Sequence, residues 1–87
     1  MNDTARIRND IRNLKQIRRE ELRRAEEESR RADDLMRRAG NPPRPQNAYE
    51  YRRTCESQAA ELRRSAEKAR RHAESLLVQI RNLERAL

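Results

Sequence analysis

The strongest constraint on the fold is a run of small and apolar residues that recurs every three or four positions through the end of the chain. Its members are Ala59, Leu62, Ala66, Ala69, Ala73, Leu76, Ile80, Leu83 and Leu87. Alternating steps of three and four place such side chains along one narrow face of an α-helix, as in a coiled coil. This face needs another helix to bury it, so the sequence first predicts a pairing of helices.

Composition supports long helices over a globular core. The 87 residues are 43% charged and 33% hydrophobic, and only two of them are aromatic. A chain this short buries only about 60% of the surface that it exposes when unfolded. Periodic sequences rich in Ala, Glu, Leu and Arg are typical of long helices, and the regular spacing argues against disorder.

The first half of the chain carries a similar stripe. Its members are Ile7, Ile11, Leu14, Arg18, Leu22, Ala25, Ser29, Ala32, Met36 and Ala39. An extra step of four near Arg18 predicts a local stutter, where Ile17 shares the face with the stripe. Both halves are therefore predicted to be amphipathic helices.

A single break separates the two stripes. Gly40 stands where a left-handed residue often ends a helix, and the following Asn-Pro-Pro-Arg-Pro segment at 41–45 forbids continuation. Asn47, with Glu50 three residues later, predicts a variant of the capping box at the start of the next helix.

These features predict an all-α fold, an antiparallel helical hairpin that forms one domain over 1–87. Its parts are a helix over about 4–39, a Gly/Pro turn over 40–46 and a helix over about 47–87. Folding about the middle of the turn pairs residues whose numbers add up to about 87. Because so thin a seam is marginal alone, we expect assembly into a four-helix bundle or coiled coil.

The pairing predicts an interface made of the larger apolar residues on and beside the stripes. They are Ile7, Ile11, Leu14, Ile17, Leu22, Leu62, Leu76, Leu77, Ile80, Leu83 and Leu87. The expected partner is a second copy of the chain or another helical protein. No small-molecule substrate is expected.

Catalytic and metal-binding patterns are not found in the sequence. His72 stands beside two arginines with no nucleophile or carboxylate at a spacing that would make it a general base. One cysteine and one histidine do not form a metal ligand set. We therefore expect neither an enzyme nor a cofactor or metal, and Cys55 is predicted to be a small buried hydrophobic residue.

The net charge of +7 points to acidic partners, although many charges only keep a helical face soluble. The hairpin is predicted to gather basic residues at its open end, where they could contact an acidic protein or, as the alternative partner, the phosphates of nucleic acid. They are Arg6, Arg8, Arg12, Lys15, Arg70 and Arg71.

Tyr49 and Tyr51 lie beside the proline turn, where they either cover the end of the bundle or form a recognition tip. The N-terminus has no apolar run typical of a secretory signal, and the longest strongly apolar run is 76–78. These observations predict no membrane span and a cytoplasmic protein, with export independent of a signal peptide left open.

Two long helices joined by a Gly/Pro turn resemble the WXG-type (Esx-like) proteins of type VII secretion and their small helical partners. The chain has no Trp, so the resemblance is one of architecture. It implies a secretion adaptor or targeting subunit that pairs with a larger helical protein. The turn at Pro42 to Pro45 is also similar to that of type III needle subunits.

The hairpin is similar as well to Rop-like dimers, in which a helical face binds RNA. Together these observations predict a non-enzymatic protein interaction module. The alternative is a Rop-like dimer that binds RNA or DNA through its basic open end.

Overall fold

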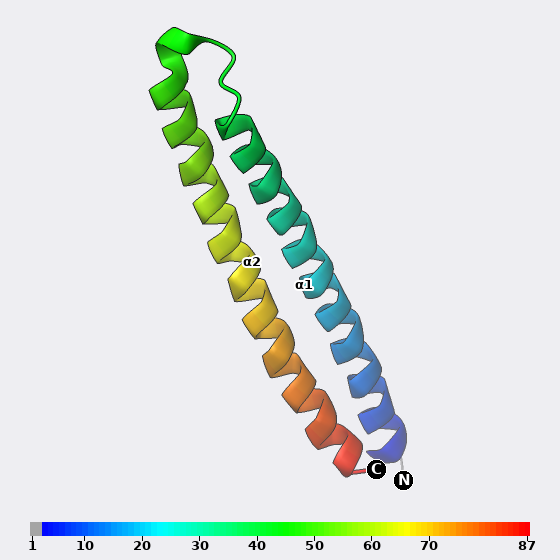
Figure 1. The fold of residues 1–87 in the computed structure, drawn as a ribbon. Coiled ribbons are helices and arrows are strands. Elements are labelled where there is room, and N and C mark those ends of the chain that lie inside the picture. Colours follow the sequence, from blue (N-terminus) through cyan, green and yellow to red (C-terminus); the bar gives the residue numbers. More distant parts are fainter. Residues whose placement is uncertain (1–2) are drawn as a thin grey trace.

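A computed structural model describes residues 3–87 and shows an antiparallel hairpin of two long helices (Figure 1). Helix α1 spans Asp3–Ala39, the short 3-10 turn η1 spans Pro45–Asn47, and α2 spans Ala48–Arg85. The predicted all-α hairpin is thereby confirmed. Residues 1 and 2, which the predicted domain includes, lie outside the described residues. The hairpin is a rod that measures 71 × 14 × 11 Å.

The face of α1 that packs on α2 alternates steps of three and four without interruption. Its central residues, all buried or half-buried, are Ile7, Ile11, Leu14, Arg18, Glu21, Ala25, Glu28, Ala32, Leu35 and Ala39, and half-buried Ser29 and Asp34 lie beside them. The predicted stutter near Arg18 is wrong, because the face continues through Glu21 and not through Leu22. Ile17 and Leu22 lie outside it, 42% and 37% exposed. The alanines in the second half of α1 face α2 with a regular heptad spacing. The same spacing continues into the first half of α1, where it places Glu21 on this face.

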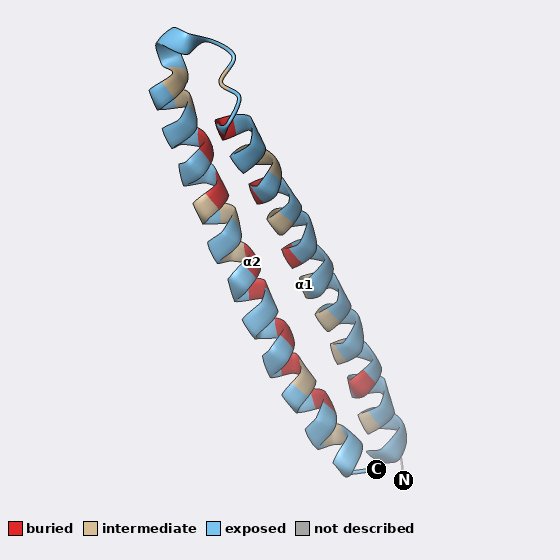
Figure 2. Ribbon diagram, in the orientation of Figure 1, coloured by how far each residue is buried: buried red, intermediate tan, exposed pale blue. Residues whose placement is uncertain are grey.

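The face of α2 matches the predicted stripe along most of its length. Its buried residues are Cys55, Ala59, Ala66, Ala69, Ala73, Leu76 and Ile80. Leu62 and Leu83 are half-buried, while Leu87 lies beyond the end of α2 and is 56% exposed. Figure 2 shows that the buried residues of the two helices lie on the sides that face each other.

The end of α1 differs from the prediction. Gly40 does not adopt a positive φ. Its backbone N–H donates to the carbonyl of Arg37 at 3.1 Å, and that of Asn41 donates to the carbonyl of Arg38 at 3.0 Å. These bonds reach back three residues and satisfy two of the last carbonyls of the helix, so a left-handed residue is not needed before Pro42.

The start of α2 also differs. Asn47 forms no side-chain capping bond, so the predicted capping box with Glu50 is wrong. Asn47 instead ends η1, which begins at Pro45. Because the ring of Pro45 fixes φ near the helical value, the chain enters α2 through this turn without a side-chain cap.

The two helices are displaced from the predicted pairing by about one heptad. Contacts between them join Lys15 to Glu84 at 3.6 Å, Asp33 to Arg63 at 3.5 Å and Glu21 to His72 at 3.3 Å. The numbers in these pairs add up to 93–99, and those of the contact between Arg24 and Ser65 to 89, all above the predicted 87. Figure 1 shows the reason: α2 starts beyond the end of α1, so its first turns overhang the other helix. A shift by one heptad keeps the two stripes together but changes every pair.

Candidate functional site

The core between the helices is thin. Eleven hydrophobic residues are buried, and seven of them are alanines. Ala25, Ala66 and Ala69 form its central cluster, and Ile80 is the one large side chain that is less than 2% exposed among the residues described. Small side chains on both helices let the backbones approach closely, but they bury little apolar surface per turn.

The structure divides the predicted interface residues into three groups. Ile11, Leu76 and Ile80 are buried within the hairpin. Five more are half-buried: Ile7, Leu14, Leu62, Leu77 and Leu83. The remaining three are exposed: Ile17, Leu22 and Leu87. Most of the predicted interface therefore closes the hairpin itself, and only part of it is left for another chain.

Leu22 and Leu77 lie at the same level on one side of the hairpin. Two contacts bracket them on this side: Lys15 with Glu84 at 3.6 Å, and Arg70 Nη2 with Ser29 Oγ at 2.7 Å. Leu22 is seven residues from Lys15 and from Ser29, and Leu77 is seven residues from Arg70 and from Glu84. Seven residues are two helical turns, so the two leucines occupy the layer between the contacts.

We call this surface the leucine side. Leu22 is 37% exposed there and Leu77 is half-buried. A groove of about 340 Å³ runs next to Leu77, and Arg19 and Arg81 lie at its edge. Met36 belongs to the same line of α1, fourteen residues beyond Leu22, and is 37% exposed. The leucine side thus offers large apolar side chains that the hairpin does not cover.

The opposite surface, which we call the histidine side, is more polar. His72 Nδ1 lies 3.3 Å from Glu21 Oε2 there, and Arg24 Nη2 donates to Ser65 Oγ at 3.3 Å. Ile17 is seven residues before Arg24 and is the large apolar residue of α1 on this side. Val78 points away from both sides on the outer surface of α2 and is 57% exposed.

Charged residues occupy core positions in the middle of α1. The side chains of Glu21 and Glu28 are only 22% and 12% exposed. The Nε of Arg18 and the Oε2 of Glu28 are buried without a hydrogen-bond partner. Sequence reasoning missed Glu21 and Glu28 as core residues, although steps of seven counted back from Leu35 lead to both of them.

Glu28 is held by two neighbours. A hydrogen bond from the Ser65 hydroxyl lowers the pKa of this carboxyl most, followed by the bond from Arg24. Arg24 Nε donates to Glu28 Oε1 at 2.8 Å, and this bond raises the pKa of Arg24. The arrangement keeps Glu28 ionised inside the seam, where it joins the two helices through polar contacts.

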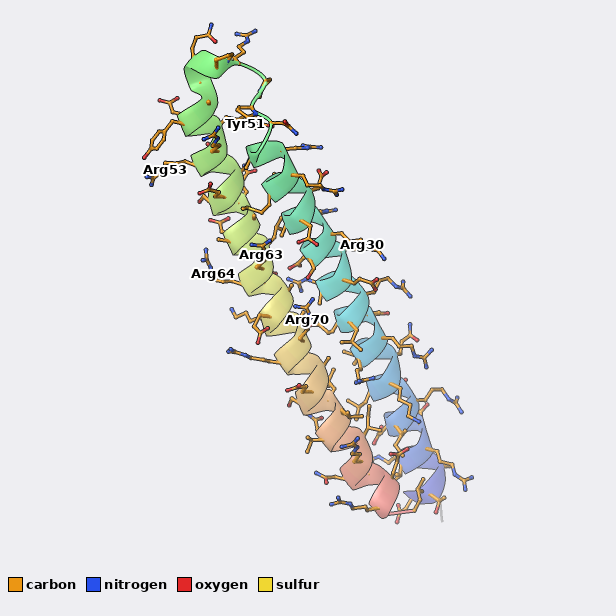
Figure 3. All side chains as sticks on the ribbon, in the orientation of Figure 1. Arg30, Tyr51, Arg53, Arg63, Arg64 and Arg70 are labelled. Carbon is orange, nitrogen blue, oxygen red and sulfur yellow. The ribbon has the colours of Figure 1, made fainter. Side chains whose placement is uncertain are left out.

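The predicted basic cluster is split along the rod. Arg6, Arg8 and Arg12 are exposed at the open end and form no ion pair within residues 3–87. Lys15 pairs with Glu84. The other two members are not brought to this cluster: Arg70 donates to Ser29, and Arg71 pairs with Glu67 at 3.4 Å. Ser29, the partner of Arg70, is fourteen residues beyond Lys15 on α1. Arg70 therefore lies about 21 Å farther from the open end than Lys15 does. Figure 3 shows Arg70 in the middle of the hairpin.

The two tyrosines near the turn have different surroundings. Tyr49 is 70% exposed, and its hydroxyl accepts a hydrogen bond from Arg53 Nη1 at 3.1 Å. The Arg53 guanidinium also lies 5.8 Å from the ring centre, within reach of a cation–π contact. Tyr51 is half-buried, and burial raises its pKa most. Of the two residues of the predicted recognition tip, Tyr49 is therefore the more exposed.

The single thiol and the single imidazole have different surroundings. Cys55 is 5% exposed and free, as expected of a small buried hydrophobic residue. His72 contacts Glu21, and no nucleophile is among the described partners of this pair. Over residues 3–87, no group of three or more His, Cys, Asp or Glu side chains is placed to hold a metal ion.

No protein-family model, curated protein or solved structure matches the chain. Neither long helix contains a stretch apolar enough to cross a membrane, within the part of the chain that the structure describes.

Proposed function

We propose that this protein is a non-enzymatic interaction module that buries its leucine side against the helices of another chain. The observation that carries the proposal is the position of Leu22 and Leu77. These two side chains share one layer of the hairpin outside its seam, where the chain itself leaves Leu22 37% exposed. Large apolar side chains that meet on one surface and are rimmed by charge are typical of a protein interface.

The thin core supports the same proposal. Seven of the eleven buried hydrophobic residues are alanines, so the seam removes little apolar surface from water. Chains of this size rarely gain more than about 3–5 kcal/mol from a single core. A second layer of helices over the leucine side adds the burial that the hairpin lacks.

The exposed surface points in the same direction. A compact monomer of 10.4 kDa exposes about 5,400 Å², whereas this rod exposes 7044 Å². Each partner in a standard interface buries about 800 Å². Side-by-side pairing along the leucine side would therefore remove about half of the excess.

Two other ideas receive less support from the geometry. Nucleic-acid binding depended on one basic cluster, but Arg70 and Arg71 lie away from Arg6, Arg8 and Arg12. The narrower idea of a secretion adaptor rests on the resemblance in architecture alone. The contacts of the hairpin add nothing to it.

Capture of binding proteins by the tagged chain tests the proposal. The doubly substituted variant Leu22→Glu/Leu77→Glu places two carboxylates at the centre of the leucine side. We expect the wild type to retain a second helical chain, identified by mass spectrometry, that this variant loses. The matched control is Ile17→Glu/Val78→Glu, which makes the same chemical change at two exposed positions off the leucine side and should retain the chain.

Circular dichroism of all three proteins shows whether the hairpin remains helical. Equal capture by the wild type and by Leu22→Glu/Leu77→Glu, with both helical, would contradict the proposal. So would a wild-type chain that retains neither copies of itself nor any other helical protein.

A further inference from the structure

The charges on the leucine side of α1 change sign at Leu22. Arg12 and Arg19 precede Leu22, and Glu26 and Asp33 follow it. These four residues are seven positions apart in sequence, so they form one line along the helix. The midpoint of the line falls between Arg19 and Glu26, at the level of Leu22. The line is therefore basic towards the open end and acidic towards the turn.

The leucine side of α2 has the same order of charge. Arg81 lies on the open-end side of Leu77, and Glu74 and Glu67 lie towards the turn. They too are spaced by seven residues, and the sign changes between Arg81 and Glu74, at the level of Leu77. Both helices therefore change sign at the same level of the rod.

The other charges on the leucine side do not cancel this order. Lys15 and Glu84 pair with each other across the seam. Arg63 pairs with Asp33, and Arg70 donates to Ser29. The open-end half then holds a formal charge of +4, from Arg8, Arg12, Lys15, Arg19 and Arg81 against Glu84. The half towards the turn holds −2, from Glu26, Asp33, Glu67 and Glu74 against Arg63 and Arg70.

The histidine side lacks this order. Its charges on α1 are Arg6, Asp10, Glu20, Arg24, Glu27, Arg31, Asp34 and Arg38, which repeatedly change sign along the helix. Separation of charge into two halves is thus a property of the leucine side, the surface that also carries Leu22 and Leu77.

Most of these charges are available to another chain. Arg12, Arg19, Arg81 and Glu74 form no ion pair within residues 3–87. Glu26 and Asp33 pair with arginines of the hairpin, but their side chains are 63% and 70% exposed. Such exposed pairs contribute at most about 1 kcal/mol, so they can exchange partners at small cost.

We propose that the leucine side binds the leucine side of a second copy of this chain, turned by a two-fold axis so that the rods are antiparallel. The inference rests on the proposed function and names its partner. In this arrangement α1 lies against α1 and α2 against α2. Arg19 meets Glu26 of the second copy, and Arg12 meets its Asp33. Leu22 and Leu77 of both copies lie at the axis.

The sign change selects the antiparallel arrangement. Parallel rods would place the basic halves together and the acidic halves together, at the cost of repulsion along the whole surface. The two-fold arrangement joins opposite halves twice, as a self-complementary interface requires. It also makes every neighbouring pair of helices in the resulting four-helix bundle antiparallel.

Charge reversal on α1 tests this geometry. The variant Arg12→Glu/Arg19→Glu makes both halves of the line acidic, and Glu26→Arg/Asp33→Arg makes both halves basic. Each homodimer then contains four like-charge contacts, so we expect its dissociation constant to rise at least about tenfold. An equal mixture of the two variants restores all four opposite-charge contacts, and it should form a heterodimer about as tight as the wild-type dimer.

Matched controls reverse charges on the histidine side. Arg6→Glu/Arg31→Glu and Glu20→Arg/Glu27→Arg change the net charge by the same amounts. We expect each control to dimerise like the wild type, and their mixture to show no preference for the heterodimer. Sedimentation velocity at low ionic strength gives the dissociation constants, and native mass spectrometry distinguishes the heterodimer because the variants differ in mass.

The inference is supported if the mixture of the two leucine-side variants prefers the heterodimer and the mixture of the two histidine-side controls does not. The absence of that preference, dimers that persist in both variants, or a wild-type monomer would overturn it. If the chain does not form the antiparallel dimer, but Leu22→Glu/Leu77→Glu loses a different helical protein that the wild type captures, the proposed function stands. If this variant captures as much as the wild type, the proposed function and the proposed dimer both fail.

Discussion

At the residue scale, the unusual feature is a set of charges inside the seam. Arg18, Glu21 and Glu28 occupy positions that a coiled coil usually gives to apolar residues. Glu28 is compensated by bonds from Arg24 and Ser65, while one of its oxygens is buried without a partner. Polar residues at core positions reduce stability but favour one register, because any sliding of the helices would bury them without partners.

The lowered pKa of Glu28 predicts part of the acid sensitivity of the hairpin. The folded state binds a proton at this carboxyl less tightly than the unfolded state, whose pKa is near 4.5. The stability that Glu28 contributes is therefore present above that pH and is lost as the pH falls through the lower, folded value. In Glu28→Gln, we expect a smaller fall in the free energy of unfolding between pH 7 and pH 3.

Urea unfolding followed by circular dichroism measures this difference at equal chain concentration. Glu27→Gln is the control, since Glu27 is exposed and forms no ion pair among the described contacts. It should keep the acid sensitivity of the wild type. An undiminished fall in Glu28→Gln would show that the bonds to Ser65 and Arg24 do not stabilise the ionised form.

At the element scale, close approach of the helices depends on alanine. Ala25 is 1% exposed and belongs to the cluster with Ala66 and Ala69. A larger side chain there has no space unless the helices separate. We expect Ala25→Leu to lower the free energy of unfolding by about 1–3 kcal/mol in urea, although leucine favours helix as alanine does.

The control for this substitution is Ala5→Leu, at an exposed position of the same helix. It should change the free energy of unfolding by no more than about 0.5 kcal/mol. An Ala25→Leu variant as stable as the wild type would mean that the helices are not held together by close alanine contacts.

The helices and the turn could be predicted from spacing, glycine and proline alone. The face of α1 could not, because its most apolar pattern runs through Leu22 whereas the structure follows the heptad through Glu21. Hydrophobicity ranks leucine above glutamate at every position. The packing of α1 against α2 decides which of the two faces the seam, and a single helix does not contain that information.

The register between the two helices could not be predicted from the sequence pattern either. A shift by one heptad leaves apolar residues facing apolar residues, so the stripes alone match equally well in either register. Contacts such as Lys15 with Glu84 distinguish the two. The split of the predicted basic cluster follows directly from this shift, because it moves Arg70 away from the residues of the open end.

At the scale of the whole molecule, the hairpin is a rod 71 Å long with a core mainly of alanine and an apolar pair left on one side. The charges around that pair form two halves of opposite sign. The rod is therefore complementary to a second copy of itself in one orientation, and we expect the helices and the dimer to be lost together on dilution.

The most direct test is the mass of the wild-type chain in solution, measured by sedimentation equilibrium over a range of concentrations at low ionic strength. We expect a monomer–dimer equilibrium that reaches twice the 10.4 kDa of one chain, and a Leu22→Glu/Leu77→Glu variant that stays near the monomer mass. A fully helical wild-type chain of 10.4 kDa at every concentration would contradict it.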